Sequence, residues 1–330
     1  MTQPSKSRRA LVDAGARLLA EGPHPEWARR DAEELLLHLF RKDARERNRA
    51  WLFANLLSPI TDRLEAEFLA LIDRRSAGEP LQYITGEADF YRMQFHVSPA
   101  VLIPRPETEL LVERAVHLVP GFMPRSDRLI QFRIVSTNPR RSFAYAAGAG
   151  AAEPARKKSP QAPRILDVGT GSGAIAISIA HDWAETEITA TDLSPAALDV
   201  ARENAVRLGF ADRIRFLEGD LLAPVIGERF EIIVCNPPYV PSADRATLAV
   251  EVREYEPALA LFAGSDGLDV CRRLIPAAFA ALTPGGFVAL EIGYGQQAAI
   301  RDLFVLSGFG QIEFVSDLQG IPRVACARRS

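Results

Sequence analysis

Four consecutive residues, Asn236-Pro237-Pro238-Tyr239, carry the strongest chemical signal in this sequence. They follow a short apolar run, residues 230–235, that is typical of a buried strand. An Asn side chain offers a carbonyl acceptor, and a Pro pair has no N–H groups and two fixed φ angles, so its carbonyls keep one direction. The Tyr ring offers a flat face. Together these groups suit the binding of a planar NH2 group whose nitrogen attacks a methyl donor; a strand-ending turn with a core Tyr is the alternative.

A second motif lies upstream, where the apolar run 165–168 leads into three alternate glycines and then into a predicted helix. Such glycines let the backbone turn sharply and approach a ligand closely. The next apolar run ends at Asp192, whose carboxylate can accept hydrogen bonds from both hydroxyls of a ribose. The candidate cofactor-binding residues here are Gly169, Thr170, Gly171, Ser172, Gly173 and Asp192.

The glycines alone do not identify the cofactor. Gly169, Gly171 and Ala174 also fit the dinucleotide pattern G-x-G-x-x-G/A, which leaves both a nicotinamide cofactor and S-adenosylmethionine open. The stretch from Asn236 to Tyr239 decides for a methyl donor, because hydride transfer has no use for it.

Composition is that of an ordinary enzyme. The chain has 330 residues with 48% hydrophobic content, enough for two cores. A net charge of −3 gives no general attraction to nucleic acid. The three Cys are isolated, so we expect no metal site and a reducing compartment. No apolar run reaches membrane-spanning length, and the N-terminus lacks the apolar core of a secretory signal, whereas an organellar transit peptide stays open.

The sequence predicts three parts. Residues 1–78 are expected to form a small helical domain that recognises a partner; the spacing of Leu64, Phe68, Leu71 and Ile72 predicts one buried helix face. Residues 79–103 are expected to form a β-hairpin linker, with short strands that include 83–85. Residues 104–330 are expected to form the catalytic domain.

Within 104–330, the sequence predicts a first helix over 106–119 and an α/β alternation from 164 onward. Between them, 121–163 is a basic, low-complexity insertion with eight basic and two acidic residues. The alternation indicates a mostly parallel sheet covered on both faces, with the ligand beyond the carboxyl ends of the strands. The expected strands are 164–168, 187–191, 213–218, 230–235, 286–292, 311–315 and 322–327, and the expected helices are 173–182, 195–208, 267–282 and 295–307.

Three further stretches, together with the two motifs above, resemble the bacterial release-factor glutamine methyltransferases, the HemK/PrmC family. These stretches are residues 78–86 followed by Phe90, residues 102–109, and residues 251–260 followed by Gly267-Leu268-Asp269. The resemblance covers roughly residues 75–119 and 164–328. The segment 121–163 departs from the family, which usually joins the preceding helix to the first strand by a short link.

The resemblance implies a seven-stranded, Rossmann-like class I methyltransferase sheet with an antiparallel last strand. It implies S-adenosylmethionine as methyl donor and, as substrate, the glutamine of the Gly-Gly-Gln motif in class 1 peptide chain release factors. Gly169 to Gly173 would line the methionine part of the cofactor and Asp192 would bind its ribose. Asn236 to Tyr239 would hold the glutamine beside it, and Asn236 would contact the cofactor as well. Leu221 falls where the family places a residue beside the adenine, often an aromatic one; a Leu there removes any stacking.

Two other functions are weighed against this one. An amino methyltransferase acting on adenine or guanine in DNA or RNA uses the same four residues, but the acidic net charge speaks against it. A non-catalytic module that binds the cofactor and docks on a translation factor is the alternative of another class. We expect a cytoplasmic, monomeric enzyme that contacts neither a membrane nor nucleic acid directly.

Overall fold

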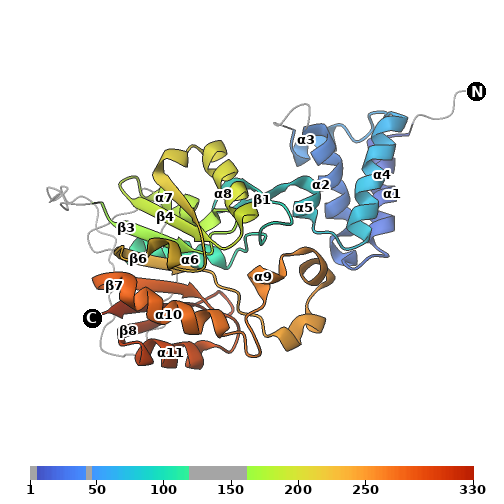
Figure 1. Cartoon of the computed structure of the whole chain (residues 1–330). Helices are drawn as coiled ribbons and strands as arrows, with labels where there is room; N and C mark the ends of the chain where they lie inside the picture. The colour runs from blue at the N-terminus through green and yellow to red at the C-terminus, as the bar shows by residue number, and fades with distance from the viewer. Residues whose placement is uncertain (1–5, 42–46, 119–161) are drawn as a thin grey trace, which may run out of the picture. The chain divides into compact units, whose positions relative to one another are not determined.

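The computed structural model describes residues 6–41, 47–118 and 162–330. The described residues form two compact units (Figure 1). The first comprises Met1–Asp89, Gln94–Ile103 and Ala243–Ala258, and the second comprises Phe90–Met93, Pro104–Ser242 and Leu259–Ser330. The basic insertion expected at 121–163 lies outside the described residues except for its last two positions.

The first unit is mainly helical, as its apolar spacing predicts. Ser7, Asn48 and Thr61 cap α1, α3 and α4, each accepting a hydrogen bond from a main-chain N–H in the first turn. Phe68 and Ile72 of the predicted face are fully buried. The helices are α1 (Arg8–Leu19), η1 (Pro25–Trp27), α2 (Ala28–Arg41), α3 (Arg49–Ala54), α4 (Asp62–Ser76) and α5 (Leu81–Thr85).

One predicted strand is wrong. Residues 83–85 belong to the helix α5, which follows Pro80 at its N-cap and ends at Gly86, where φ is +75°. A glycine in the left-handed region ends a helix without strain, so the two flanking residues outweigh the β preference of Tyr, Ile and Thr. The hairpin itself is present: β1 (Glu87–Phe90) pairs with β2 (Met93–His96).

The second unit is built on a seven-stranded sheet in the order β5-β4-β3-β6-β7-β9-β8. The pairs from β5 to β7 are parallel, and β9 pairs antiparallel with both β7 and β8. The strands are β3 (Arg164–Val168), β4 (Glu187–Asp192), β5 (Ile214–Glu218), β6 (Phe230–Cys235), β7 (Leu282–Glu291), β8 (Phe309–Ser316) and β9 (Pro322–Arg329). This confirms the predicted α/β fold with its mostly parallel sheet.

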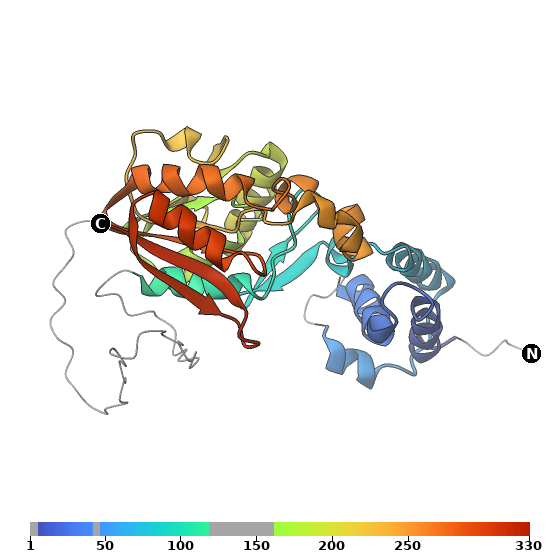
Figure 2. The same cartoon turned by 90° about the horizontal axis from the view of Figure 1, so that it is seen from below.

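Helices cover both faces of the sheet (Figures 1 and 2). On one face α6 and α7 pack against each other; on the other, α10 and α11 do so and also contact the strands β7 to β9. The helices are α6 (Thr108–His117), α7 (Ala174–Asp182), α8 (Pro195–Leu208), α10 (Asp269–Ala281) and α11 (Gln297–Leu306). The short helical segments of this unit are η2 (Ala211–Arg213), η3 (Ala223–Val225) and α9 (Ala258–Leu261). Two others, η4 (Ser242–Thr247) and η5 (Glu251–Tyr255), lie in or at the start of the segment 243–258 that belongs to the first unit.

The core of the second unit lies between the sheet and these helices. Apolar side chains of β6 and β7, such as Phe230, Ile233 and Leu290, are fully buried against Leu274 and Phe304 of α10 and α11. In the part of the chain that the structure describes, no helix combines the length and apolar character needed to cross a membrane.

Candidate active site

The predicted site residues meet at one edge of the sheet, the carboxyl ends of its parallel strands. In the pairing of β3 with β6, Val168 lies opposite Cys235, so that Gly169 and Asn236 follow adjacent strands. Asp192 ends β4, next to β3 on its other side, and Leu221 follows β5. The topology therefore brings together residues that the sequence separates by dozens of positions.

The glycine-rich loop after β3 is fixed by main-chain hydrogen bonds. The N–H groups of Gly169 and Thr170 donate to the carbonyl of Thr191 in β4, at 2.8 and 3.0 Å. Gly169 and Gly171 have φ of +71° and +56°, and a Cβ added to either would meet no atom within 4 Å. The loop thus presents bare backbone to open space, which suits close approach of a ligand.

The side chains of this loop make contacts within the protein. Thr170 and Ser172 are buried, and the Thr170 hydroxyl donates to Asp167 Oδ2 at 2.7 Å. A Cβ at Gly173 would crowd Ile177 and Ala201, which shows that this glycine allows α7 to pack closely. The surface offered to a ligand is therefore mainly the loop's backbone.

Asp192 has a half-buried carboxylate whose two oxygens each accept one main-chain N–H. Gly171 donates to Oδ2 at 2.8 Å, and Ser194 donates to Oδ1 at 2.9 Å. A carboxylate has about four acceptor positions, so each oxygen can accept a further hydrogen bond. The arrangement fits a ligand that carries two adjacent hydroxyl groups.

Asp167 lies beneath the glycine-rich loop and is fully buried. Its Oδ2 accepts from Thr170 and from the N–H of Ala176, whereas Oδ1 has no hydrogen-bond partner in the described structure. Burial raises the pKa of this carboxyl to about 7. An unsatisfied buried acceptor at this place fits a ligand group with N–H or O–H donors.

Leu221 adopts a left-handed backbone with φ of +51°, which is unusual for a side chain of this size. Two hydrogen bonds support the segment: Thr191 Oγ1 donates to the carbonyl of Leu221 at 3.0 Å, and Gly219 N–H donates to the carbonyl of Asp192 at 2.9 Å. The strained residue therefore belongs to the same edge as Asp192, and such strain is found preferentially at functional sites.

Asn236 is hydrogen-bonded to Thr108, which is in turn bound to Glu291, and both partners come from distant parts of the sequence. Its Nδ2 lies 3.2 Å from Thr108 Oγ1 at the start of α6, and Thr108 donates to Glu291 Oε2 at 2.6 Å. Glu291 ends β7 and is buried, and its Oε1 accepts from the Tyr239 hydroxyl at 3.4 Å. Both ends of the Asn-Pro-Pro-Tyr stretch are thereby joined to one carboxylate.

The middle of the stretch is fixed by packing and by a glutamine. Pro237 is buried and Pro238 is half-buried. Gln296, just before α11, donates to the carbonyls of Tyr239 and Gly267 at 3.1 and 3.2 Å. A Cβ at Gly267 would lie 2.2 Å from the Tyr239 oxygen, so only glycine allows the two segments to approach this closely.

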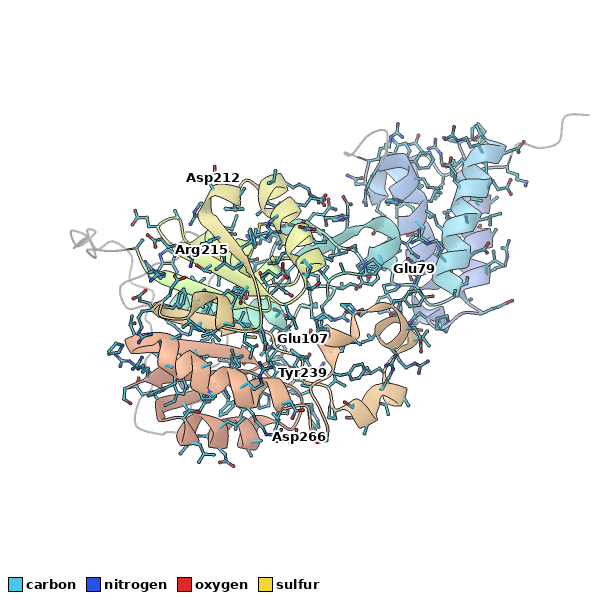
Figure 3. The ribbon with its side chains drawn as sticks, viewed as in Figure 1. Glu79, Glu107, Asp212, Arg215, Tyr239 and Asp266 are labelled. Carbon is cyan, nitrogen blue, oxygen red and sulfur yellow. The ribbon has the colours of Figure 1, made fainter. Side chains whose placement is uncertain are left out.

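The ionisable side chains of Glu291 and Tyr239, at the Asn-Pro-Pro-Tyr stretch, influence each other's pKa. Burial raises the pKa of Glu291 to about 7, and it also raises the pKa of the Tyr239 hydroxyl, so that this group keeps its proton near neutrality. Arg105, Arg323 and Glu107 exert charge effects on the same groups, and Figure 3 shows Glu107 and Tyr239 in the same part of the unit, away from Asp212 and Arg215. No group of acidic, His and Cys side chains in the described residues is arranged for a metal ion.

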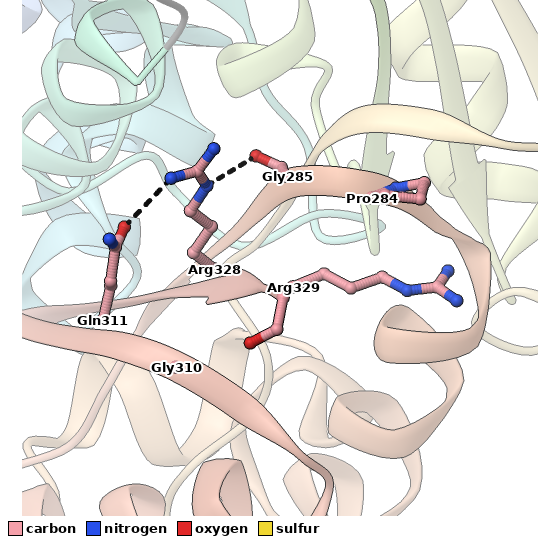
Figure 4. Close-up of a pocket in the computed structure, with 7 residues that line it drawn as sticks. Pro284, Gly285, Gly310, Gln311, Arg328 and Arg329 are labelled. Carbon is pink, nitrogen blue, oxygen red and sulfur yellow. Dashed lines mark hydrogen bonds between the residues drawn. The ribbon is translucent and has the colours of Figure 1, made fainter.

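A surface hollow elsewhere contains none of these residues. It lies near the start of β7, at the opposite end of that strand from Glu291 (Figure 4). Arg328 there donates to the carbonyl of Gly285 at 3.1 Å and to the side chain of Gln311 at 3.4 Å. Its lining residues are Pro284, Gly285, Gly310, Gln311, Arg328, Arg329 and Ser330.

Sequence reasoning missed four residues of the site: Thr108, Asp167, Glu291 and Gln296. Glu291 carried a usable signal, because it is an acidic residue inside the apolar run 286–292. A charged side chain in a buried strand usually has a partner. Gln296 and Thr108 carried no such signal, since their contacts depend on the folded chain.

The chain is similar to known families and proteins over most of its length. The profile described as "PrmC N-terminal domain" matches residues 9–86, and "Methyltransferase small domain" matches residues 155–253. The release factor glutamine methyltransferase of Moorella thermoacetica is 42% identical over 90% of this chain and 88% of its own length. The protein of the same name from Geobacter sulfurreducens is 36% identical over 85% of this chain and 84% of its own length.

Solved structures support the fold. The hMettl16 catalytic domain, in complex with the MAT2A 3'UTR hairpin 6, has a TM-score of 0.50 and 12% identity, and the match covers 82% of this chain and 83% of that chain. At this identity the likeness concerns the architecture alone.

Proposed function

Since this chain belongs to the release factor glutamine methyltransferase family, we propose that it methylates class 1 translation termination release factors. The methyl group passes from S-adenosylmethionine to the side-chain amide nitrogen (N5) of the glutamine in the Gly-Gly-Gln motif. The observation that carries the proposal is the position of Asn236, one strand away from the glycine-rich loop. Because of this adjacency, a methyl donor on the loop and an amide on Asn236 can meet.

The residues present fit S-adenosylmethionine. The bare backbone of Gly169 and Gly171 would hold the methionine part, with the unsatisfied Oδ1 of Asp167 beneath it. The carboxylate of Asp192 would accept the ribose hydroxyls, and Leu221 would lie beside the adenine. Thr170, Ser172 and Gly173 shape the loop. When bound, the cofactor supplies an electrophilic methyl group on a sulfonium.

The substrate amide is held by the Asn-Pro-Pro-Tyr stretch. The side-chain oxygen of Asn236 and the main-chain carbonyl of Pro237 accept the two N–H bonds of the glutamine. Pro238 and the ring of Tyr239 form walls for the flat group. These contacts turn the nitrogen lone pair toward the methyl group and stabilise the positive charge that develops on nitrogen.

Alignment provides most of the catalysis. An amide nitrogen is a weak nucleophile because its lone pair is delocalised into the carbonyl. Fixing reactants in a productive geometry contributes up to roughly 7–11 kcal/mol. The protonated product is a strong acid and loses its proton to water, so that no carboxylate base is required; Glu291 is already bound by Thr108 and Tyr239.

The roles of the three parts of the chain are also proposed from its membership of this family. Residues 1–78 would recognise the release factor, 79–103 would link the domains, and 104–330 would carry the chemistry. We place the enzyme in the cytoplasm as a monomer, with protein rather than nucleic acid or membrane as its partner.

Mass spectrometry of a release factor tests the proposal. After incubation with S-adenosylmethionine and this enzyme, the tryptic peptide that contains Gly-Gly-Gln should gain one methyl group on the glutamine. DNA and RNA substrates are included in parallel with labelled methyl donor. Label in nucleic acid alone would favour the adenine or guanine methyltransferase, and cofactor binding without any transfer would favour the non-catalytic module.

A further inference from the structure

A row of hydrogen bonds joins Asn236, Thr108 and Glu291, and the donor and the acceptor of each bond can be identified. Thr108 and Glu291 are 4% and 2% exposed, so neither exchanges this contact freely with water. The Thr108 hydroxyl has one proton, and its oxygen lies 2.6 Å from Glu291 Oε2 and 3.2 Å from Asn236 Nδ2. An ionised carboxylate can only accept, so the proton of Thr108 is committed to Glu291.

The consequence for Asn236 is a fixed orientation of its carboxamide. With its proton committed, the Thr108 oxygen can only accept from Asn236, and only the NH2 group of the carboxamide can donate. The reverse orientation would set two acceptor oxygens against each other in a buried place, which is unfavourable. The Asn236 oxygen is therefore turned away from Thr108.

We propose that Thr108 and Glu291 are positioning residues that lock Asn236 with its oxygen toward the substrate, and that this lock makes the enzyme select glutamine over glutamate. The inference rests on the proposed function. Two acceptors, Asn236 Oδ1 and the Pro237 carbonyl, match the two N–H bonds of a primary amide. An ionised glutamate side chain has only acceptor oxygens, so it would place acceptors against these two acceptors and is rejected.

The lock depends on the charge of Glu291, whose pKa burial raises to about 7. The groups that face it are the Thr108 hydroxyl and Glu107 at the start of α6, the Tyr239 hydroxyl after β6, and Arg323 on β9. When Glu291 is protonated it can donate to Thr108, which then can donate to Asn236 and allow the carboxamide to turn over. The lock therefore strengthens as the pH rises through about 7, where Glu291 ionises, and weakens as the pH falls below it.

Kinetics of three variants test the lock. Thr108→Val keeps the shape but removes the hydroxyl, Thr108→Ser restores the hydroxyl, and Glu291→Gln removes the ionisable group. As a matched control, Thr283→Val removes a hydroxyl that donates to the Phe230 carbonyl at 3.3 Å near the start of β7. Each enzyme is assayed with a release factor, and the same factor with glutamate in place of the Gly-Gly-Gln glutamine is added as a competitor.

We expect Thr108→Val to lower kcat about three- to tenfold, the usual effect of one hydrogen bond, with the KM for S-adenosylmethionine unchanged. The glutamate factor should inhibit this variant more strongly than wild type by a similar factor. Thr108→Ser should restore both values, and Thr283→Val should leave them unchanged. With saturating S-adenosylmethionine, so that titration of Asp167 beneath the proposed cofactor site does not limit the rate, we expect the wild-type rate to fall as the pH drops below 7 and this fall to be absent in Thr108→Val and in Glu291→Gln.

The outcomes separate the two claims. If the wild type leaves the glutamine unmethylated, the proposed function fails and the inference fails with it. If the wild type methylates it but Thr108→Val retains wild-type discrimination and its pH profile, only the lock is overturned. Should Thr108→Val not fold, a Glu291→Gln profile that still falls below pH 7 overturns the lock by itself.

Discussion

The side-chain amide of Gln296 donates a hydrogen bond to the main-chain carbonyl of Tyr239, with 3.1 Å between nitrogen and oxygen. The same nitrogen donates to the Gly267 carbonyl, and Oε1 accepts from the N–H of Gly293 at 2.9 Å. One side chain thereby ties three backbone segments together behind the Asn-Pro-Pro-Tyr stretch. The position of the Tyr239 backbone therefore depends in part on this glutamine.

Replacement of Gln296 by Glu should disturb this position strongly. A carboxylate cannot donate, so two main-chain carbonyls would lose their donor and face a negative charge. We expect the free energy of unfolding to fall by about 1–3 kcal/mol and turnover to fall by about tenfold. Urea unfolding and steady-state kinetics measure the two effects, with exposed Gln297→Glu as the control. Wild-type turnover in Gln296→Glu would show that the tie has no catalytic role.

Asn236→Ala should lower the rate of methyl transfer by on the order of a hundredfold or more. The change removes one of the two oxygens proposed to hold the substrate amide, and a preorganised charge-stabilising group contributes about 2.7–4 kcal/mol. Single-turnover kinetics with saturating cofactor measure the chemical step. Asn55→Ala, which removes a side-chain hydrogen bond to Trp51 in the helical unit, is the control. A near-wild-type rate in Asn236→Ala would remove this residue from the mechanism.

Asp192→Ala should weaken the binding of S-adenosylmethionine. Hydrogen bonds to a charged group contribute about 1.5–3 kcal/mol each, so loss of the proposed ribose contacts should raise Kd at least tenfold. Titration calorimetry without release factor measures this directly, and Asp199→Ala on the exposed side of α8 is the control. Equal affinities for wild type and Asp192→Ala would contradict the ribose assignment.

Asp167→Asn should change how stability depends on pH. The pKa of Asp167 is raised to about 7 in the folded protein from an ordinary value of 3.8, because burial disfavours its charge. Its protonated form therefore favours folding at low pH, and this contribution is lost as the pH rises through 7. Asn cannot ionise, so the variant should gain on the order of a few kcal/mol relative to wild type between about pH 4 and 8.

Urea unfolding of the cofactor-free protein at several pH values provides the measurement. Glu291 is buried in the same unit and has a raised pKa too, but it is present in both proteins and cancels in the difference. A difference between the two proteins that stays constant over this range would show that Asp167 titrates normally.

The parallel strands of the sheet could be predicted because each contains an apolar run that ends at or just before glycine, an acidic residue or Asn-Pro. The fold class follows from their alternation with amphipathic helices. Residues 83–85 show where this reasoning fails: Tyr-Ile-Thr favours a strand, but Pro80 and Gly86 fix a short helix. Boundary residues decide such short segments more than the preference of the segment itself.

The motifs of the site could be predicted, whereas the contacts that fix them could not. Asn236 and Asp192 stand out by type and place, since each follows a buried strand. The row behind Asn236 joins residues 128 and 183 positions apart in the sequence, and no local pattern encodes such a pair. The pairing of β6 with β7 brings Glu291 close to Asn236, and the packing of α6 against both strands brings Thr108 to the same amide.

The chain segment that follows the Asn-Pro-Pro-Tyr stretch belongs to the helical unit. Ala243–Ala258 folds with it, Arg75 of α4 pairs with both Asp31 and Glu251, and the Tyr255 hydroxyl donates to the Ala77 carbonyl at 3.2 Å. Arg75 is 6% exposed, so the two carboxylates compensate for the burial of its positive charge. A chimera that takes its first 103 residues from a relative must therefore take 243–258 from that same relative, because the helical unit is encoded in separate pieces of the gene.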